Sequence, residues 1–349
     1  RTTQQDHHIG MGKWRKGQLK RISSGIGATG QAIAVGLLLL VATTAQATTA
    51  TSVLRPIPAP DNLMPAKVRL GEQLFHDPRL SADNTVSCAS CHRLTEGGDD
   101  GRPVSSGIKG RQGEHNAPTV FNARYNVDQN WDGSAPSLAA QINGPVQNPN
   151  EMGMDWQAVV DTLADIAPYQ KTFEQIYPDG ITAANVRDAI AEFEKSLVTL
   201  DAPFDHYLRG DRDALTPTQR EGYRLFRQYG CASCHNGRNV GGNMYAHMGI
   251  MGDYFADHDK QGKPHLGRFN VTGEEGDRHL FRVPSLRLAV DTTPYLHDGS
   301  VETLSEVIQI MAEYQLGRQI PDEDVEHIEA FLRSLKGEYR PYNTDRPGS

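Results

Sequence analysis

The sequence is poor in cysteine. Its 349 residues contain four cysteines, and all of them fall in two copies of one pentapeptide, CASCH: Cys88, Cys91, Cys231 and Cys234. No cysteine therefore remains for a structural disulfide. Alternating apolar and polar patterns, which predict strands, are almost absent, and this favours an all-α fold. The apolar run at 32–42 is shorter than the ~20 residues that a membrane-spanning helix needs.

Both pentapeptides have the spacing of a haem c attachment site. In C-x-x-C-H, two thiols form thioether bonds to the porphyrin and the adjacent histidine, here His92 or His235, ligates the iron. A zinc ribbon would need its two C-x-x-C pairs about 15 to 20 residues apart, whereas these begin 143 residues apart. A redox-active C-x-x-C is expected beside a βαβ pattern, and neither copy has one. The sequence therefore predicts two covalently bound haem c groups.

The first 47 residues predict export. They contain a basic segment, the apolar run and a small-x-small end at Ala45 to Ala47, which are typical of a secretory signal peptide. A membrane anchor is the alternative. Cleavage after about Ala47 would place the mature protein in the periplasm, where haem c is attached, without a membrane span.

Charge is distributed unevenly along the chain. Residues 1–47 carry a net charge of +5 and the whole chain carries −8, so the remaining residues carry −13. An acidic surface disfavours nucleic acid as a partner and could steer a basic redox protein. It could equally serve solubility alone.

Helical patterns precede both motifs and form an internal repeat. LGEQLF and EGYRLF share the pattern G-x-x-LF ahead of the cysteines. We predict an all-α fold of two cytochrome c-like haem domains, at 48–200 and 201–349. The segment 201–217 is rich in Asp, Pro and Gly and marks the boundary. Long irregular loops are expected at 96–118 and 236–279, where Gly, Asn and Pro are frequent.

The second axial position at each iron decides what that haem can do. A methionine there raises the reduction potential and favours electron transfer, whereas an open position admits a substrate. Met311 lies downstream of the second motif on a predicted helix. It also forms an apolar i, i+3, i+4, i+7 stripe with Leu304, Val307 and Ile308, and this pattern alone favours a core position. Met244, Met248 and Met251, in a glycine-rich loop, are competing candidates.

Further stretches complete a recognisable series: LFHDPRLS, VSCASCH, NAPTVFNA, WDGSAPSLAAQINGPVQ, APFDHYLRGD, GCASCHNG, TTPYLHDG and IMAEYQLG. In order and spacing they resemble the bacterial di-haem cytochrome c peroxidases. The related enzyme that matures a tryptophan-derived quinone cofactor is similar but more distant. The resemblance implies reduction of hydrogen peroxide with electrons from a small donor protein, such as a mono-haem cytochrome c or a cupredoxin. It also suggests a homodimer.

The resemblance also implies which residues act. Met311 would ligate the iron of the C-terminal haem, and the N-terminal haem would be the site of peroxide reduction. Glu151 matches the acid–base residue there and Gln141 a hydrogen-bonding partner for bound peroxide. Trp131 matches a tryptophan between the two haems. Without the resemblance, these would be read as ordinary polar or core positions.

A calcium site is implied in the same way. Asn116, Thr292 and the carbonyl group of Pro294 match the family's calcium ligands between the two domains. Oxygen ligands suit this hard cation. Asn and Thr in loops more often only cap turns.

One position departs from the family pattern. Many of these peroxidases carry a histidine in the loop after the first motif that blocks the N-terminal iron until the other haem is reduced. Ile108 stands at that position, and isoleucine cannot ligate iron. We therefore predict an open N-terminal site that needs no reductive activation, with His115 as a substitute ligand in the competing hypothesis. Two other functions remain as alternatives: an oxidase that modifies a protein substrate, and a di-haem electron carrier.

Overall fold

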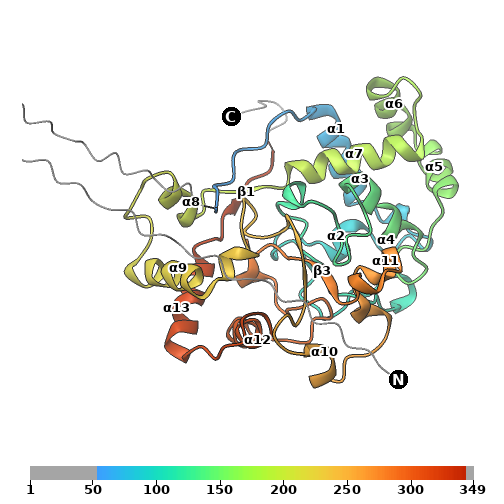
Figure 1. The fold of residues 1–349 in the computed structure, drawn as a ribbon. Coiled ribbons are helices and arrows are strands. Elements are labelled where there is room, and N and C mark those ends of the chain that lie inside the picture. The colour runs from blue at the N-terminus through green and yellow to red at the C-terminus, as the bar shows by residue number, and fades with distance from the viewer. Residues whose placement is uncertain (1–52, 343–349) are drawn as a thin grey trace, which may run out of the picture. The chain divides into compact units, whose positions relative to one another are not determined.

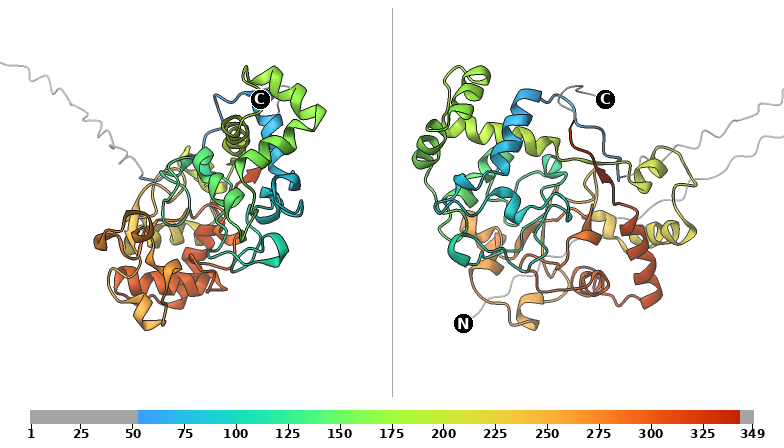
Figure 2. Two further views of the ribbon diagram at one scale, coloured as in Figure 1. Left: turned by 90° about the vertical axis from the view of Figure 1, so that its right-hand side faces the viewer. Right: turned by 180° about the vertical axis from the view of Figure 1, so that it is seen from behind.

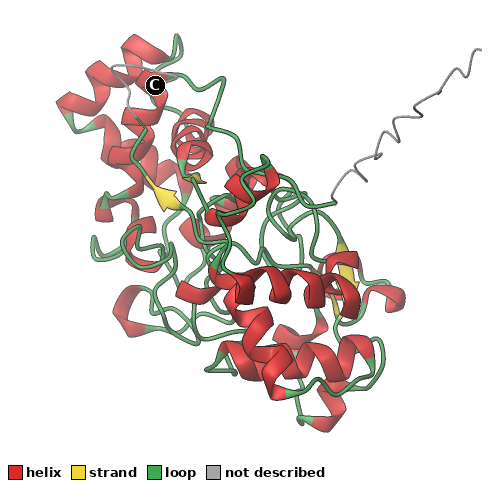
Figure 3. Ribbon diagram, turned by 90° about the vertical axis from the view of Figure 1, so that its left-hand side faces the viewer, coloured by secondary structure: helices red, strands yellow, loops and turns green. Residues whose placement is uncertain are grey.

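Helices and long loops make up nearly all of the computed structural model, which describes residues 53–342 (Figures 1 and 3). The predicted signal peptide and the residues before it, together 1–47, lie outside the described residues. The predicted mainly α-helical character is confirmed. In the described part of the chain the α-helices are α1 (Pro65–Phe75), α2 (Cys88–Cys91), α3 (Leu138–Gln141), α4 (Asn143–Gln147), α5 (Trp156–Ala164), α6 (Ala167–Ile176), α7 (Ala183–Ser196), α8 (Pro203–Leu208), α9 (Pro217–Tyr229), α10 (Tyr254–Asp257), α11 (Phe269–Thr272), α12 (Leu304–Leu316) and α13 (Asp322–Arg333).

The strands form two small antiparallel pairs. β1 (Thr199–Leu200) pairs with β4 (Glu338–Tyr339), and β2 (Tyr245–His247) pairs with β3 (Leu280–Arg282). Within residues 53–342, no helix is both long enough and apolar enough to cross a lipid bilayer.

The first hydrophobic core lies where α1 crosses α7. Gly71 of α1 approaches α7 so closely that a Cβ atom there would lie 1.9 Å from the carbonyl oxygen of Ala189. Only glycine permits this approach. Leu and Phe of the G-x-x-LF pattern, Leu74 and Phe75, are fully buried in this core, and Phe193 of α7 packs against Phe75.

The second core repeats this arrangement with α9 and α13. A Cβ atom on Gly222 of α9 would lie 1.8 Å from the carbonyl oxygen of His327 on α13. Leu225 and Phe226 follow it into a core that also contains Phe331. Figure 2 shows both crossings, blue α1 beside green α7 and yellow α9 beside red α13. The repeated G-x-x-LF pattern therefore records the same helix crossing in each half of the chain.

The segments expected as loops and as a boundary contain short ordered elements. Residues 236–279 include β2, α10 and α11. The segment 201–217 includes α8, and its Phe204 is fully buried in the second core. A single apolar helical pattern at 154–177 is divided into α5 and α6, because Pro168 starts a new helix.

Candidate functional site

The first CASCH motif is held by a short capped helix. Cys88 to Cys91 form α2, which begins at a capping box of Ser87 and Ser90. His92 follows at the C-cap, and its Nδ1 atom lies 3.2 Å from the carbonyl oxygen of Gly98. With the proton on Nδ1, this bond leaves Nε2 free to ligate a metal. Burial lowers the pKa of His92, which favours the neutral imidazole that iron binds.

The second motif is presented at the end of α9. The helix ends at Gly230, whose φ of 99° is a left-handed conformation that favours glycine. A short 3-10 helix, η4 (Cys231–Ser233), follows. The backbone N–H of His235 donates to the carbonyl oxygen of Cys231 at 3.0 Å. Burial lowers the pKa of His235 to about 4, so its imidazole is neutral at pH 7.

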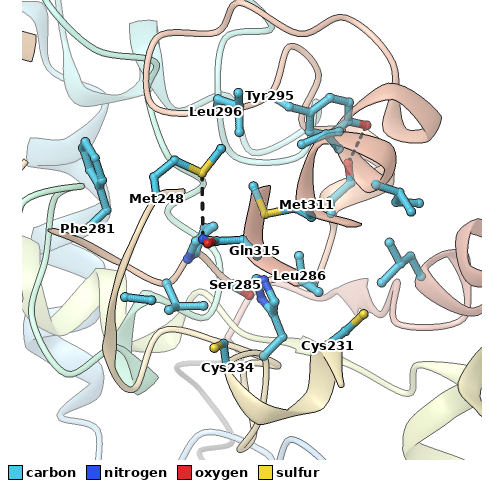
Figure 4. A pocket seen from close by; sticks show the side chains of 18 of the residues that line it. Cys231, Cys234, Met248, Phe281, Ser285, Leu286, Tyr295, Leu296, Met311 and Gln315 are labelled. Carbon is cyan, nitrogen blue, oxygen red and sulfur yellow. Dashed lines mark hydrogen bonds between the residues drawn. The ribbon is translucent and has the colours of Figure 1, made fainter. Parts of the chain in front are cut away.

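A large, mostly apolar cavity opens above the second motif. It has a volume of about 450 Å³, and its walls include Cys231, Cys234, His235, Trp131 and Met311. Figure 4 shows Met311 across the cavity from the two cysteines. None of the four cysteines forms a disulfide, so all four thiols are available for thioether bonds. Two thiols, a neutral imidazole and a thioether around an apolar cavity are the donor set that a haem c needs.

Met311 faces the cavity, although its helix also contributes to the second core. Leu304 and Ile308 of the same stripe belong to that core and also line the cavity, whereas Met311 lines the cavity without belonging to the core. Met248 lines it as well, and its sulfur accepts a weak hydrogen bond from Nε2 of Gln315 at 3.9 Å (Figure 4). Met251, by contrast, is 61% exposed. The structure thus leaves two thioethers near the space where an axial ligand would lie.

Trp131 connects this cavity to the chain segment that follows the first motif. Its Nε1 atom donates to the backbone oxygen of Asn116 at 2.9 Å. The backbone oxygen of Trp131 accepts a hydrogen bond from the backbone N–H of Arg282 in β3 at 2.9 Å. Asn116 and Thr292, two of the three predicted calcium ligands, also line the cavity, and the side-chain amide of Asn116 donates to the backbone oxygen of Arg102.

Glu151 and Ile108 are direct neighbours. The backbone N–H of Ile108 donates to the backbone oxygen of Glu151 at 2.7 Å. Oε1 of Glu151 accepts from Nδ2 of Asn148 at 2.7 Å, and burial raises the pKa of this carboxyl group. Burial is also the main cause that raises the pKa of Cys91, with a further contribution from Asp100 and Glu151. Glu151 therefore lies close to the first motif.

The other two predicted residues of this region have different surroundings. Gln141 is half-buried at the end of α3, which packs on α7. The Nε2 atom of His115 lies 3.2 Å from the backbone oxygen of Pro264, and its ring centroid is 6.4 Å from that of His297. Both neighbours of His115 come from the C-terminal half of the chain.

Sequence reasoning missed several buried charged residues. Glu194 of α7 is 6% exposed, its Oε2 atom has no hydrogen-bond partner, and burial raises its pKa to about 8. It also contributes to the raised pKa of Cys88. Its position four residues after Ile190, on the apolar stripe of α7, was the signal that could have identified it. Asp99 is buried with both carboxylate oxygens unpartnered, and burial raises its pKa to about 7.

Comparisons with known proteins agree with one another. A family model described as "Di-haem cytochrome c peroxidase" matches residues 65–213. The cytochrome c551 peroxidase of Nitrosomonas europaea is 41% identical over 307 residues, which cover 85% of this chain and 90% of that protein. The cytochrome c peroxidase Ccp of Escherichia coli is 46% identical over 293 residues, 84% of this chain but only 63% of the relative. The chain thus spans less than two thirds of that relative's length.

A solved structure shares the fold. The crystal structure of a MauG-like protein associated with microbial copper homeostasis matches with a TM-score of 0.70 and 28% identity, over 82% of this chain and 93% of that one. The predicted family, with its enzyme class of peroxide-reducing oxidoreductases, is therefore confirmed. The chain belongs to the di-haem cytochrome c peroxidase family.

Proposed function

We propose that this chain reduces hydrogen peroxide to water at an N-terminal haem and receives the electrons through a C-terminal haem. The observation that carries this assignment is the position of Glu151. Its carboxyl group is partly buried near the first CASCH motif, is oriented by Asn148 and has a pKa raised by burial. A structural or purely electron-carrying haem domain has no need of such a group.

The reaction consumes two electrons and two protons for each peroxide and releases two water molecules. The haem groups supply the iron chemistry that breaks the oxygen–oxygen bond and stores the oxidising equivalents. Glu151 accepts the proton of the peroxide oxygen that binds, and delivers it to the oxygen that leaves. A raised pKa suits this double role because proton transfer is most efficient when the pKa lies near the working pH. Gln141 is assigned as a hydrogen-bonding partner of the bound peroxide.

The N-terminal site is proposed to be open in the resting protein. Ile108 is 4% exposed and lies against the Glu151 segment. An isoleucine side chain cannot ligate iron, so reductive activation should not be required. His115 is not needed as a substitute ligand, because its imidazole already contacts Pro264.

Electron transfer is assigned to the C-terminal half. Cys231, Cys234, His235 and Met311, which line the same cavity as Trp131, would hold the second haem. A thioether ligand raises the potential of that haem and makes it the acceptor for a small donor protein, a mono-haem cytochrome c or a cupredoxin. Trp131 would relay electrons from there toward the N-terminal site.

The proposal also covers the domain bounds, a calcium ion, the cell compartment and the oligomeric state. The haem domains would comprise residues 48–200 and 201–349, which supply the first and the second hydrophobic core apart from Leu288 in the first core and Leu54 in the second. A calcium ion held by Asn116, Thr292 and the carbonyl group of Pro294 would fix the two domains relative to each other. The mature protein would work in the periplasm as a homodimer.

The decisive experiment mixes the haem-loaded protein with hydrogen peroxide and a reduced mono-haem cytochrome c. We expect the donor to be oxidised with two electrons consumed per peroxide. A protein that passes electrons between donors but leaves peroxide untouched would be an electron carrier. Consumption of peroxide that oxidises a protein side chain and spares the donor would instead identify a protein-modifying oxidase.

A further inference from the structure

Three side chains of the C-terminal half form a cluster of metal-ligand type. They are His265, His297 and Asp298, and one ligand atom from each lies within 4.8 Å of the other two. Nδ1 of His265 and Nε2 of His297 are 2.7 Å apart. His297 is 4% exposed, whereas His265 and Asp298 are only partly buried. The cluster is therefore anchored in the protein interior and accessible from one side.

The surrounding residues hold two of the three side chains in place. The imidazole of His297 packs against Phe281, with ring centroids 4.7 Å apart. Oδ2 of Asp298 accepts from Nζ of Lys260 at 2.6 Å, and Oδ1 accepts from the hydroxyl group of Ser300 at 2.7 Å. Oδ1 also accepts from the backbone N–H of Ser300 at 3.3 Å. Each carboxylate oxygen has two lone pairs, so Oδ2 keeps one for a further partner. Hydrogen bonds of this kind orient the ligating carboxylates of metal sites.

We propose that Nδ1 of His265, Nε2 of His297 and a carboxylate oxygen of Asp298 bind one zinc-type divalent cation. Two imidazoles and one carboxylate are a ligand set that Zn²⁺ accepts, and water would complete the tetrahedron. At Zn–N distances of 2.0–2.1 Å, two ligating nitrogens lie about 3.3 Å apart. The two imidazole nitrogens must therefore separate by about 0.6 Å from their hydrogen-bonded distance.

The required rearrangement is small and conserves protons. His265 lies in a short 3-10 helix, η5 (Lys263–Leu266), within a loop, and can move more easily than the buried His297. In the neutral pair a single proton lies between the two nitrogens. The metal would take the place of this proton. The proton would move to the other ring nitrogen of the imidazole that carried it. No net proton release is needed.

A cation bound at this site would change the reduction potential of a haem in the neighbouring cavity. His297 lines that cavity together with Trp131 and Met311. A cation bound beside it stabilises the reduced, less positive state of an iron in the cavity. Zinc should therefore raise the potential of the C-terminal haem. Neither the site nor this effect requires that the chain reduces peroxide.

The test uses Zn²⁺ alone, because zinc is redox-inert and cannot exchange electrons with the haems. The haem-loaded protein, in which both CASCH motifs are occupied, is treated with a chelator and titrated with zinc by calorimetry. We expect one zinc ion per chain. His265→Ala should abolish this binding, and Ser300→Ala should weaken it about 10-fold through loss of an orienting hydrogen bond.

His258→Ala is the matched control, since His258 is an exposed histidine of the same region at the C-cap of α10. It should bind zinc as the parent does. Unchanged haem spectra in every variant verify that the fold is intact. The proposal is overturned if the parent protein binds no zinc, or if His265→Ala binds it as tightly as the parent and His258→Ala do.

Discussion

The backbone N–H of Ile108 donates a 2.7 Å hydrogen bond to the backbone oxygen of Glu151. The two backbone segments also pack closely on either side of this hydrogen bond. A Cβ atom on Gly107 would lie 2.1 Å from the backbone oxygen of Asn150, and one on Gly153 would lie 2.6 Å from Cδ1 of Ile108. The loop after the first motif is thus packed directly on the segment of Glu151, the proposed acid–base residue, with the buried Ile108 at the position where the resemblance implies a blocking histidine.

The resting protein should therefore react with peroxide without prior reduction. With both haems ferric, we expect one high-spin signal in electron paramagnetic resonance and a fast reaction in stopped-flow mixing. Ile108→His should restore the family pattern: only low-spin ferric signals at rest, and reaction with peroxide only after one electron has been added.

His115→Ala separates the two hypotheses for this loop. Because His115 contacts Pro264 and lies near His297, its removal should change neither the resting spectrum nor the resting reactivity. If the parent is low-spin and unreactive at rest, and His115→Ala gains a high-spin signal and reacts, then His115 is the blocking ligand.

Glu151→Gln should slow the reaction with peroxide about 10²- to 10⁴-fold, the usual effect of losing a general acid–base group. The amide has nearly the same shape and can keep the contact with Asn148 after its own amide group turns, so both haem spectra should be unchanged. Stopped-flow rates against peroxide concentration measure the effect. Reaction at the parent rate would exclude Glu151 from proton transfer.

Met311→Leu should lower the reduction potential of one haem and leave the other unchanged. Leucine fills a similar volume but cannot ligate iron, so the thioether's stabilisation of the reduced state is lost. Turnover with an external donor should slow, while the first reaction with peroxide persists. Redox titration monitored by absorbance measures both potentials.

Met248→Leu is the control for this prediction, because Met248 lines the same cavity. The reduction potentials of both haems in the Met248→Leu variant should match those of the parent. The opposite result, in which Met248→Leu lowers one potential and Met311→Leu lowers neither, would assign the ligand to Met248 and leave Met311 as a cavity-wall residue.

Local patterns predicted the parts of this structure that depend on neighbouring residues. CASCH spacing predicts two haem attachment sites, which agrees with the family of the chain, and the G-x-x-LF repeat anticipated α1 and α9 together with their buried faces. The partners that these helices cross, α7 and α13, could not be paired by periodicity alone. A helical stripe shows which face is buried but does not show what covers it.

The arrangements that local patterns could not predict depend on contacts between segments far apart in the chain. His265 and His297 are 32 residues apart and lie in segments without regular periodicity, so no pattern brings them together. The two thioethers facing the cavity, Met248 and Met311, come from a strand-flanking loop and a helix. Only the folded chain shows that both reach the same space.

A buried ion pair should control the stability of the C-terminal half. Arg287 and Asp205 are both fully buried and joined by two hydrogen bonds, of 2.7 and 3.1 Å. Asp205→Ala would leave the guanidinium group without its counter-charge, which costs about 3–5 kcal/mol. We expect a correspondingly lower free energy of unfolding in urea titrations of the haem-loaded protein.

Replacing both partners should cost less than replacing one. The double variant Asp205→Leu with Arg287→Met removes both buried charges and keeps most of the volume. Arg224→Ala, which breaks the exposed pair with Glu221, is the control and should cause no comparable loss. A double variant less stable than Asp205→Ala would show that the other contacts of Arg287, with the backbone oxygens of Arg238 and Arg55, matter more than its charge.

Glu194 should make the stability of the protein depend on pH. Burial raises the pKa of its carboxyl group from 4.5 to about 8, so between these values the folded chain holds a proton that the unfolded chain has released. Stability therefore falls as the pH rises through this range, and the loss is complete only above about pH 8. Glu194→Gln cannot ionise and should escape this loss. Urea titrations from pH 5 to pH 9 should show the free energy of unfolding of Glu194→Gln rising relative to that of the parent, whereas Glu72→Gln, on the exposed side of α1, should keep the parent's dependence. Parallel curves for Glu194→Gln and the parent would mean that the Glu194 carboxyl group has the same pKa in the folded and unfolded chains.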